Sequence, residues 1–300
     1  MRKKVKLVKK LVKNLAFLPM EATNFLLYPF RILRNELKAD KDSRFVFVLS
    51  FPRSGTTALG SLLQQPGANI NYYGEFFALN HWNAKQRLLS KFYPFFSIRF
   101  LIGHIIQKKK WRYYQFERLR LNPEKVLSVL ATVPGTHVFK IFPFHLYDES
   151  LKNLIKRFNP EIMFLRRNHL DRLVSHKKAM ATGVWHGVST DSVEVDIDPK
   201  QLDKYMKDYQ DFYKKMFDCA ITHNLNILDV EYETLFEPTN IKKVLNFILA
   251  DPAKVAALNL VPRTLKQDSI GTSQQAFLKK VSNNDGKKEI SDFNFHRINK

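Results

Sequence analysis

The chain has 300 residues, a formal net charge of +21 and a single cysteine, Cys219. This length is enough for one large α/β core, and the ordinary apolar content of 45% favours a folded enzyme over a disordered or fibrous chain. One cysteine cannot form an internal disulfide, and no spaced Cys/His set suggests a zinc site. We therefore expect a cytoplasmic protein without a bound metal, in which Cys219 is a buried thiol on a helix.

Residues 1–43 form a basic N-terminal extension. Residues 1–41 hold eleven Lys/Arg against three acids, and leucines recur at helical spacing from Leu7 to Leu18. This pattern fits a helix on an anionic membrane surface, at the inner face of a membrane, and it fits equally a helix packed on its own domain. Pro19 and Glu21 interrupt the apolar run, so we expect neither a membrane span nor a secretory signal.

Residues 44–300 are expected to form one enzyme domain, which opens with a buried strand over 45–49 and a tight turn before a helix from Ala58. A turn of this kind directs free backbone N–H groups and the positive end of a helix at an anion. The lysine of an ATP-type phosphate loop is absent, because threonine follows the glycine. The candidate anion-binding residues are Pro52, Arg53, Ser54, Gly55, Thr56 and Thr57.

A basic, aromatic insert occupies about 85–130. Residues 85–120 carry ten Lys/Arg against one acid, Glu117, and include a run of Lys, Trp, Arg and Tyr from 108 to 114. Such residues bind bases, sugar rings or lipid. Because no helix-turn-helix, zinc-finger or RNA-recognition signature accompanies them, nucleic acid is disfavoured. An acceptor-binding or membrane-facing helical subdomain fits better, and a plain packed insert stays open.

A second strand-to-helix motif lies over 161–176. An apolar strand over 161–165 ends near Arg167, and a helix beginning near Asn168 carries Ser175 about two turns along. An arginine at the end of a strand and a serine on the following helix can hold one phosphate from two sides.

The rest of the chain alternates strands with helices, which predicts a mostly parallel sheet flanked by helices on both faces. The alternating residues Val193, Val195 and Ile197 suggest a short half-exposed strand or extended edge. The expected strands are 135–142 and 226–232, and the expected helices are 151–158, 199–223 and 241–249.

The two motifs together resemble the signatures of sulfotransferases that use 3′-phosphoadenosine 5′-phosphosulfate (PAPS). The first is similar to the 5′-phosphosulfate loop, and the second is similar to the 3′-phosphate element with its Arg167 and Ser175. The resemblance implies a P-loop-type fold, PAPS as the co-substrate, and sulfuryl transfer to an acceptor hydroxyl. A metal is not demanded, because Arg53 and Lys140 can supply the compensating charge.

The resemblance is closest to the bacterial enzymes that modify carbohydrates or glycolipids. The animal enzymes carry a histidine base two residues after a lysine, and Phe142 stands at that place here. The bacterial enzymes carry a glutamate base in a Gly-Glu pair, which Glu75 matches. Residues 232–235 look like a structural hallmark that follows a later core strand, and 263–269 resembles a segment that closes over the cofactor.

The resemblance thus makes Glu75 the candidate catalytic base, assisted by Arg53 and Lys140. A free glutamate titrates near 4.3, so its aromatic neighbours would need to raise its pKa. An exposed helix-capping glutamate is the structural alternative. His145 is the second choice for the base, and His81, His176 and His186 have less positional support.

Two other classes of function stay open. A P-loop kinase or NTPase would need a Gly-Lys-Ser/Thr loop and a magnesium-binding aspartate after a strand, for which only Asp229 offers a substitute. A basic membrane- or nucleic-acid-binding protein with a degenerate enzyme core would show losses among four cofactor residues. All four are present: Arg53, Thr57, Arg167 and Ser175.

Overall fold

The computed structural model of the chain describes residues 43–64, 70–78, 120, 123–131, 133–185, 190, 192–256, 258 and 272–285. The chain divides into two compact units. The smaller comprises Met1–Ser43 and Phe76–Pro134, and the larger comprises Arg44–Glu75 and Gly135–Lys300. The expected N-terminal helix, most of the basic insert and the 263–269 segment lie outside the described residues.

The described part of the smaller unit contains one helix, α7, over Glu124–Leu130. Leu127 and Leu130 of this helix are buried. The Ser43 hydroxyl donates to the Leu130 carbonyl at 3.5 Å. Phe76 and Phe77 are buried as well and meet edge to face, with ring centroids 5.3 Å apart.

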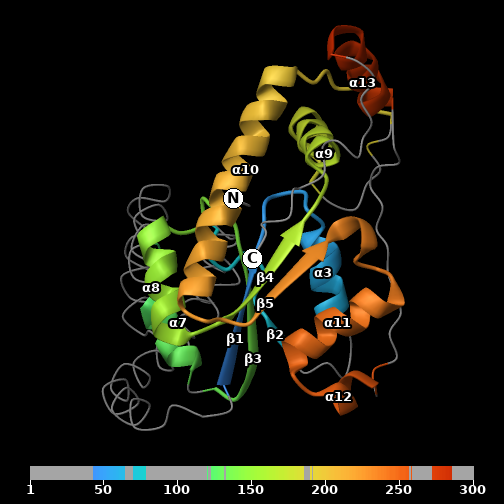
Figure 1. Cartoon of the computed structure of the whole chain (residues 1–300). Coiled ribbons are helices and arrows are strands. Elements are labelled where there is room, and N and C mark those ends of the chain that lie inside the picture. The colour runs from blue at the N-terminus through green and yellow to red at the C-terminus, as the bar shows by residue number, and fades with distance from the viewer. Residues whose placement is uncertain are drawn as a thin grey trace, which may run out of the picture. The chain divides into compact units, whose positions relative to one another are not determined.

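The larger unit is built on a five-stranded parallel sheet in the order β2-β3-β1-β4-β5 (Figure 1). The central strand β1 pairs with β4 from Val46 opposite Glu161 to Leu49 opposite Phe164. The strands are β1 Ser43–Leu49, β2 Ile70–Tyr72, β3 Gly135–Ile141, β4 Glu161–Arg166 and β5 Ile227–Glu231. The helices are α3 Thr56–Leu63, α8 Asp148–Phe158, α9 His169–Thr182, α10 Pro199–Thr222, the 3-10 turn η2 Tyr232–Thr234, α11 Pro238–Leu249, α12 Pro252–Ala256 and α13 Thr272–Asp285.

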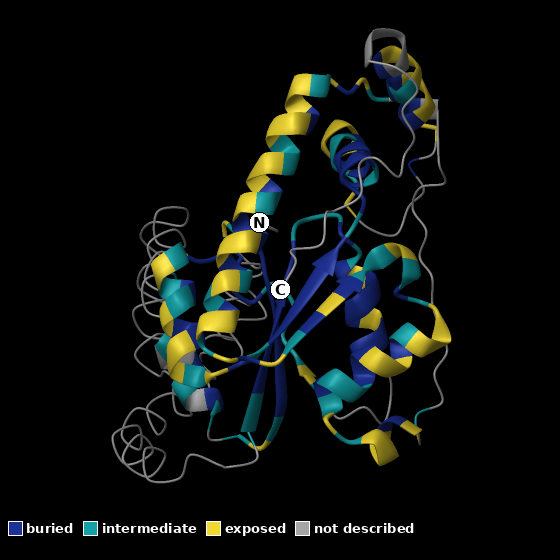
Figure 2. Ribbon diagram, viewed as in Figure 1, coloured by how far each residue is buried: buried dark blue, intermediate teal, exposed yellow. Residues whose placement is uncertain are grey.

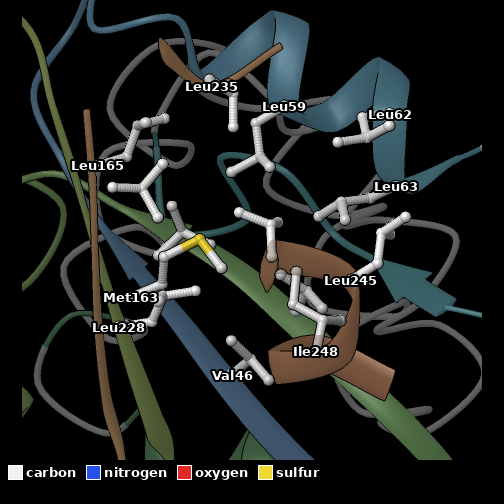
Figure 3. Close-up of a cluster of buried hydrophobic side chains, with 14 of the residues drawn as sticks. Val46, Leu59, Leu62, Leu63, Met163, Leu165, Leu228, Leu235, Leu245 and Ile248 are labelled. Carbon is white, nitrogen blue, oxygen red and sulfur yellow. The ribbon is translucent and has the colours of Figure 1, made fainter. Parts of the chain in front are cut away.

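Helices cover both faces of this sheet, which is why β1 is apolar over 45–49 and β4 is apolar over 162–165. On one face α3 and α11 pack over alternate strand residues such as Val46, Met163 and Leu228 (Figure 3). Helices α8 and α10 lie on the opposite face. There Tyr213 of α10 packs on Phe164 of β4, with the ring centroids 5.3 Å apart. Figure 2 shows the central strands almost entirely buried, whereas the edge strand β5 and the outer stripe of α10 carry exposed residues.

A second cluster joins α9, α10 and α13 beyond the end of the sheet. Leu170 and Leu173 of α9 pack with Leu202 of α10 and with Phe277 and Val281 of α13. Since parallel strands all end at the same edge, the turns after the five strands meet beneath this cluster, at the edge where doubly wound folds bind ligands.

The predicted α/β fold is confirmed, and the expected strands and helices are present with ends shifted by a few residues. Residues 193–197 form no strand, but their side chains alternate between partly buried and exposed up to the buried Ile197, so the extended edge stays a prediction. One local expectation was wrong. Cys219 lies on α10 as expected, but it is half-buried rather than buried, because it stands beside the outer stripe of that helix.

Candidate functional site

The first motif forms the turn between β1 and α3. Gly55 caps α3 in the left-handed conformation, with φ of 82°, and Arg53 is also left-handed, with φ of 69°. Helix α3 begins without a side-chain cap and without an acidic residue in its first turn, so its N–H groups and positive dipole end face the turn. The base of the turn is tied to the next strand, because the buried Ser50 hydroxyl donates to the Leu165 carbonyl at 2.8 Å.

Tyr232, the first residue of η2 after β5, fixes the shape of this turn. A Cβ atom at Gly55 would lie 1.9 Å from Cδ2 of the Tyr232 ring, so only glycine fits there. The guanidinium of Arg167 stacks on the same ring, 4.9 Å from its centroid. One aromatic ring therefore contacts both motifs.

The second motif lies directly beside the first. Arg167 Nη1 donates to the Arg53 carbonyl at 2.9 Å, and Arg53 Nε donates to the Ser175 hydroxyl at 2.9 Å. Arg53 also donates through Nη1 to the carbonyl of Trp185. Residues more than a hundred positions apart in sequence thus form one hydrogen-bonded set of two guanidinium groups and a buried hydroxyl.

The start of α9, which places Ser175, is fixed by two polar contacts. The Asn168 side chain caps the helix by accepting from the N–H groups of Leu170 and Asp171. The Asn168 N–H in turn donates to Glu233 Oε1 at 2.8 Å. Burial raises the pKa of the Glu233 carboxyl. The chain after β5 therefore supports α9 as well as the first turn.

A second group of polar side chains gathers around Lys140, near the end of β3. Its ammonium lies 2.7 Å from Glu75 Oε1 and donates to Thr56 Oγ1 at 3.2 Å. The chain after β2 continues alongside β3, because the Lys140 N–H donates to the Gly74 carbonyl at 3.0 Å. This pairing brings Glu75 close to the first turn of α3, which follows the anion-binding loop.

His145 completes this group. It is fully buried, and its Nδ1 accepts the Phe142 N–H at 3.1 Å. A neutral ring that accepts through Nδ1 carries its proton on Nε2. That Nε2 lies 3.8 Å from Glu75 Oε2, which is longer than a hydrogen bond.

The structure brings most of the predicted site residues together. Arg53, Arg167 and Ser175 form one cluster, and Glu75, Lys140 and His145 form the other, with Thr56 at the junction. Ser54 and Thr56 are buried, Pro52 and Gly55 are half-buried, and Thr57 is exposed. His176 stands next to Ser175 and packs on Trp185, and burial lowers its pKa. His81 and His186 lie outside the described residues.

Three features of the site escaped the sequence analysis. The ring of Tyr232 was assigned only a structural place, Thr56 was not expected to contact Lys140, and Arg172 was not singled out. Arg172 lies inside the second motif, three residues before Ser175, so its position there is the signal that was available.

Among the residues that the structure describes, no group of three or more His, Cys, Asp or Glu side chains could hold a metal ion. The helices described here include none with the length and apolarity needed to cross a membrane.

The site can therefore neutralise an extended anion at two places and presents a carboxylate beside it. Comparison with known proteins agrees with this chemistry. A sequence profile of the sulfotransferase family matches residues 46–247, which include both motifs and all five strands except the first residues of β1. No curated protein sequence matches the chain. Because the profile covers about two-thirds of the sequence, the chain belongs to the sulfotransferase family and is a transferase.

Proposed function

We propose that this sulfotransferase uses PAPS as its donor and transfers the sulfuryl group to a hydroxyl of a carbohydrate or glycolipid. The observation that carries the donor assignment is the contact of Arg53 with Ser175, which joins the two motifs at 2.9 Å. PAPS has phosphate groups at both ends of its ribose, so a site for it needs two anion-binding elements side by side. The N-terminus of α3 receives the 5′-phosphosulfate, and Arg167 with Ser175 receives the 3′-phosphate.

Glu75 is the proposed base. His145 is a poor alternative, because its Nδ1 lone pair already accepts the Phe142 N–H and its other nitrogen carries a proton. Glu75 Oε1 lies 2.7 Å from Lys140 Nζ, and Oε2 lies 3.8 Å from His145 Nε2. The ammonium thus orients the carboxylate, while about a fifth of the Glu75 side chain stays exposed to an incoming acceptor.

The transfer step follows from this arrangement. The acceptor oxygen attacks the sulfur in line, its proton passes to Glu75, and the bond from sulfur to the 5′-phosphate oxygen breaks. The products are the sulfate ester and adenosine 3′,5′-bisphosphate, with one proton released. Lys140, which donates to Thr56 at the start of α3, lies where it can stabilise negative charge on the bridging oxygen as that bond lengthens.

The acceptor class rests on the resemblance to bacterial enzymes and is supported by exposed aromatic residues that follow β3, on either side of His145. Phe144 is 55% exposed, and its ring meets that of His145 edge to face at 5.0 Å. Tyr147, three residues further along, is 42% exposed. Exposed aromatic rings on the segment that carries His145 suit the apolar face of a sugar ring or a glycolipid.

The donor assignment is tested by calorimetric titration of adenosine 3′,5′-bisphosphate without magnesium. We expect binding by the wild type, and a loss of at least about tenfold in affinity for Arg53→Ala and for Arg167→Ala separately, because each removes charge-assisted hydrogen bonds. Arg157→Ala, on the exposed end of α8, is the control and should bind as the wild type does. A strict need for magnesium, or a preference for ATP, would favour the kinase alternative instead.

The base is tested with Glu75→Gln, which keeps the shape of the side chain. We expect this variant to keep its affinity for the bisphosphate and to lose turnover by about a hundredfold or more. Glu161→Gln is the matched control, since Glu161 also pairs with a cation, Arg44, at the opposite edge of the sheet. Unchanged turnover in Glu75→Gln would remove Glu75 from the mechanism.

The acceptor and the membrane contact need separate experiments. Incubation of the enzyme with labelled PAPS and a host-cell extract, followed by mass spectrometry, identifies the sulfated product. A labelled product without a sugar would refute the proposed acceptor class. We further propose that residues 1–40 place the enzyme on the inner face of a membrane. Deleting them should then abolish sedimentation with anionic vesicles, and equal sedimentation of both forms would favour a helix packed on its own domain.

A further inference from the structure

Arg172 on α9 is a buried cation that the mechanism above does not use. It lies three residues before Ser175 and has no solvent-exposed surface. Its Nε, Nη1 and Nη2 atoms have no hydrogen-bond partner, and no ion pair involves it within the described part of the chain. A buried charge in this state is costly, because it has lost its water and gained neither a counterion nor a full set of acceptors.

Three aromatic rings surround the guanidinium. Its central carbon lies 3.9 Å from the centroid of Tyr205, 4.0 Å from that of Tyr209 and 4.8 Å from that of Phe51. Tyr209 is held in place by a hydrogen bond to Tyr213 at 3.1 Å. Ring faces attract a cation but do not neutralise it, and an arginine side chain stays charged inside a protein.

Arg167, Arg53 and His176 place further cationic or basic groups near Arg172. Burial lowers the pKa of Arg172, and the positive charge of Arg167 lowers it further. Burial also lowers the pKa of His176, and the charges of Arg172 and Arg53 add to that effect. Two acids lie nearby. Asp171, the preceding residue on α9, accepts from Gln274, and Glu233 accepts from the Asn168 N–H. Neither forms an ion pair with Arg167 or Arg172 within the described ranges.

We propose that Arg172 is a third cation of the donor site, whose charge stays without a counterion until an anionic nucleotide binds beside Arg53, Arg167 and Ser175. This inference rests on the proposed function. Arg172 does not touch the donor; it acts through space, across a region of low dielectric where its field is little screened. The unliganded protein is less stable because of this charge, and the bound anion recovers the loss as affinity.

The alternative is that Arg172 only clamps α9 to α10 and to Phe51. Arg172→Met separates the two cases, because methionine fills a similar volume and removes the charge. Arg157→Met is the matched control. The central guanidinium carbon of Arg157 also lies over a ring, 5.5 Å from the centroid of Phe158, but this arginine is exposed at the C-terminal end of α8. The measurements are the melting temperature without ligand and the dissociation constant of adenosine 3′,5′-bisphosphate.

For Arg172→Met we expect a melting temperature at or above that of the wild type and an affinity for the bisphosphate lower by about tenfold, at low and at high salt alike. Arg157→Met should change neither quantity. A lower melting temperature with unchanged affinity would overturn the proposal.

If Arg172→Met lowers both the melting temperature and the affinity, the variant Arg172→Lys separates the two explanations. Recovery of affinity by lysine without recovery of stability supports a role of the charge, and no recovery of affinity refutes it. If the wild type binds ATP but not the bisphosphate, the proposed function fails, and the same comparison made with ATP still tests Arg172.

Discussion

Gly55→Ala tests the packing of Tyr232 against the anion-binding turn. Alanine at this position meets two separate costs. The backbone φ of 82° is left-handed, which costs a residue with a Cβ about 1 to 2 kcal/mol. The new methyl group would also lie 1.9 Å from the Tyr232 ring, and forcing such a contact apart costs about 1 to 3 kcal/mol. We therefore expect Gly55→Ala to lower the free energy of unfolding by about 2 to 5 kcal/mol.

Two comparisons separate these costs. Gly183, the C-cap of α9, has φ of 70°, and a Cβ added there would meet nothing within 4 Å, so Gly183→Ala carries the backbone cost alone. In a Tyr232→Ala background, Gly55→Ala loses its clash and should again cost only about 1 to 2 kcal/mol. The coupling energy of the Gly55–Tyr232 cycle is then about 1 to 3 kcal/mol.

Urea unfolding followed by tryptophan fluorescence measures each variant, with the linear extrapolation to water. Titration of adenosine 3′,5′-bisphosphate gives a second readout, because the Tyr232 ring also supports Arg167. If Gly55→Ala costs no more than Gly183→Ala, or costs the same with and without Tyr232, then the ring does not determine the shape of the turn and the reasoning is refuted.

Three further predictions concern the edges of the site. Lys140→Met should lower turnover by about a hundredfold and change the affinity for the donor little. Steady-state kinetics measures the turnover, and a titration of the bisphosphate measures the affinity. A variant that loses affinity and keeps its turnover would contradict this prediction. Arg166→Met removes the ion pair between the buried Arg166 and Asp229, which lie 2.5 Å apart. It should lower the free energy of unfolding, measured in urea, by about 1 to 2 kcal/mol. An unchanged urea midpoint would show that this ion pair does not stabilise the fold. For Glu233→Gln the prediction is one of pH dependence. Burial raises the pKa of Glu233 in the folded protein, so its contribution to stability is present below the ordinary glutamate pKa and is lost as the pH rises through the folded pKa. As the pH rises over this range, the urea midpoint of the wild type should fall relative to that of Glu233→Gln. A difference between the two midpoints that does not change with pH would show that the pKa of Glu233 is not raised by folding.

The sequence was sufficient for features encoded within a few neighbouring residues. The apolar runs at 45–49 and 161–165 predicted buried strands, because a parallel strand covered on both faces has no polar side. The tight turn of the first motif and the asparagine before α9 predicted where two helices begin, although α3 begins at Thr56 rather than at Ala58. β2 escaped notice, since it has only three residues and its central Asn71 is exposed.

The contacts that make a site from these pieces depended on the tertiary structure. Nothing near Arg53 in sequence indicates that its side chain reaches Ser175, 122 residues away, or that Tyr232 fills the space beside Gly55. Nor does the sequence distinguish Arg172 from a solvated helix arginine, because burial depends on where α10 and Phe51 pack. Local patterns determine which strands and helices form, whereas the order of the strands in the sheet determines which of their ends meet. Which charges lie close together in the site depends on how these strand ends are arranged, because the distances between the side chains cannot be deduced from their order along the chain.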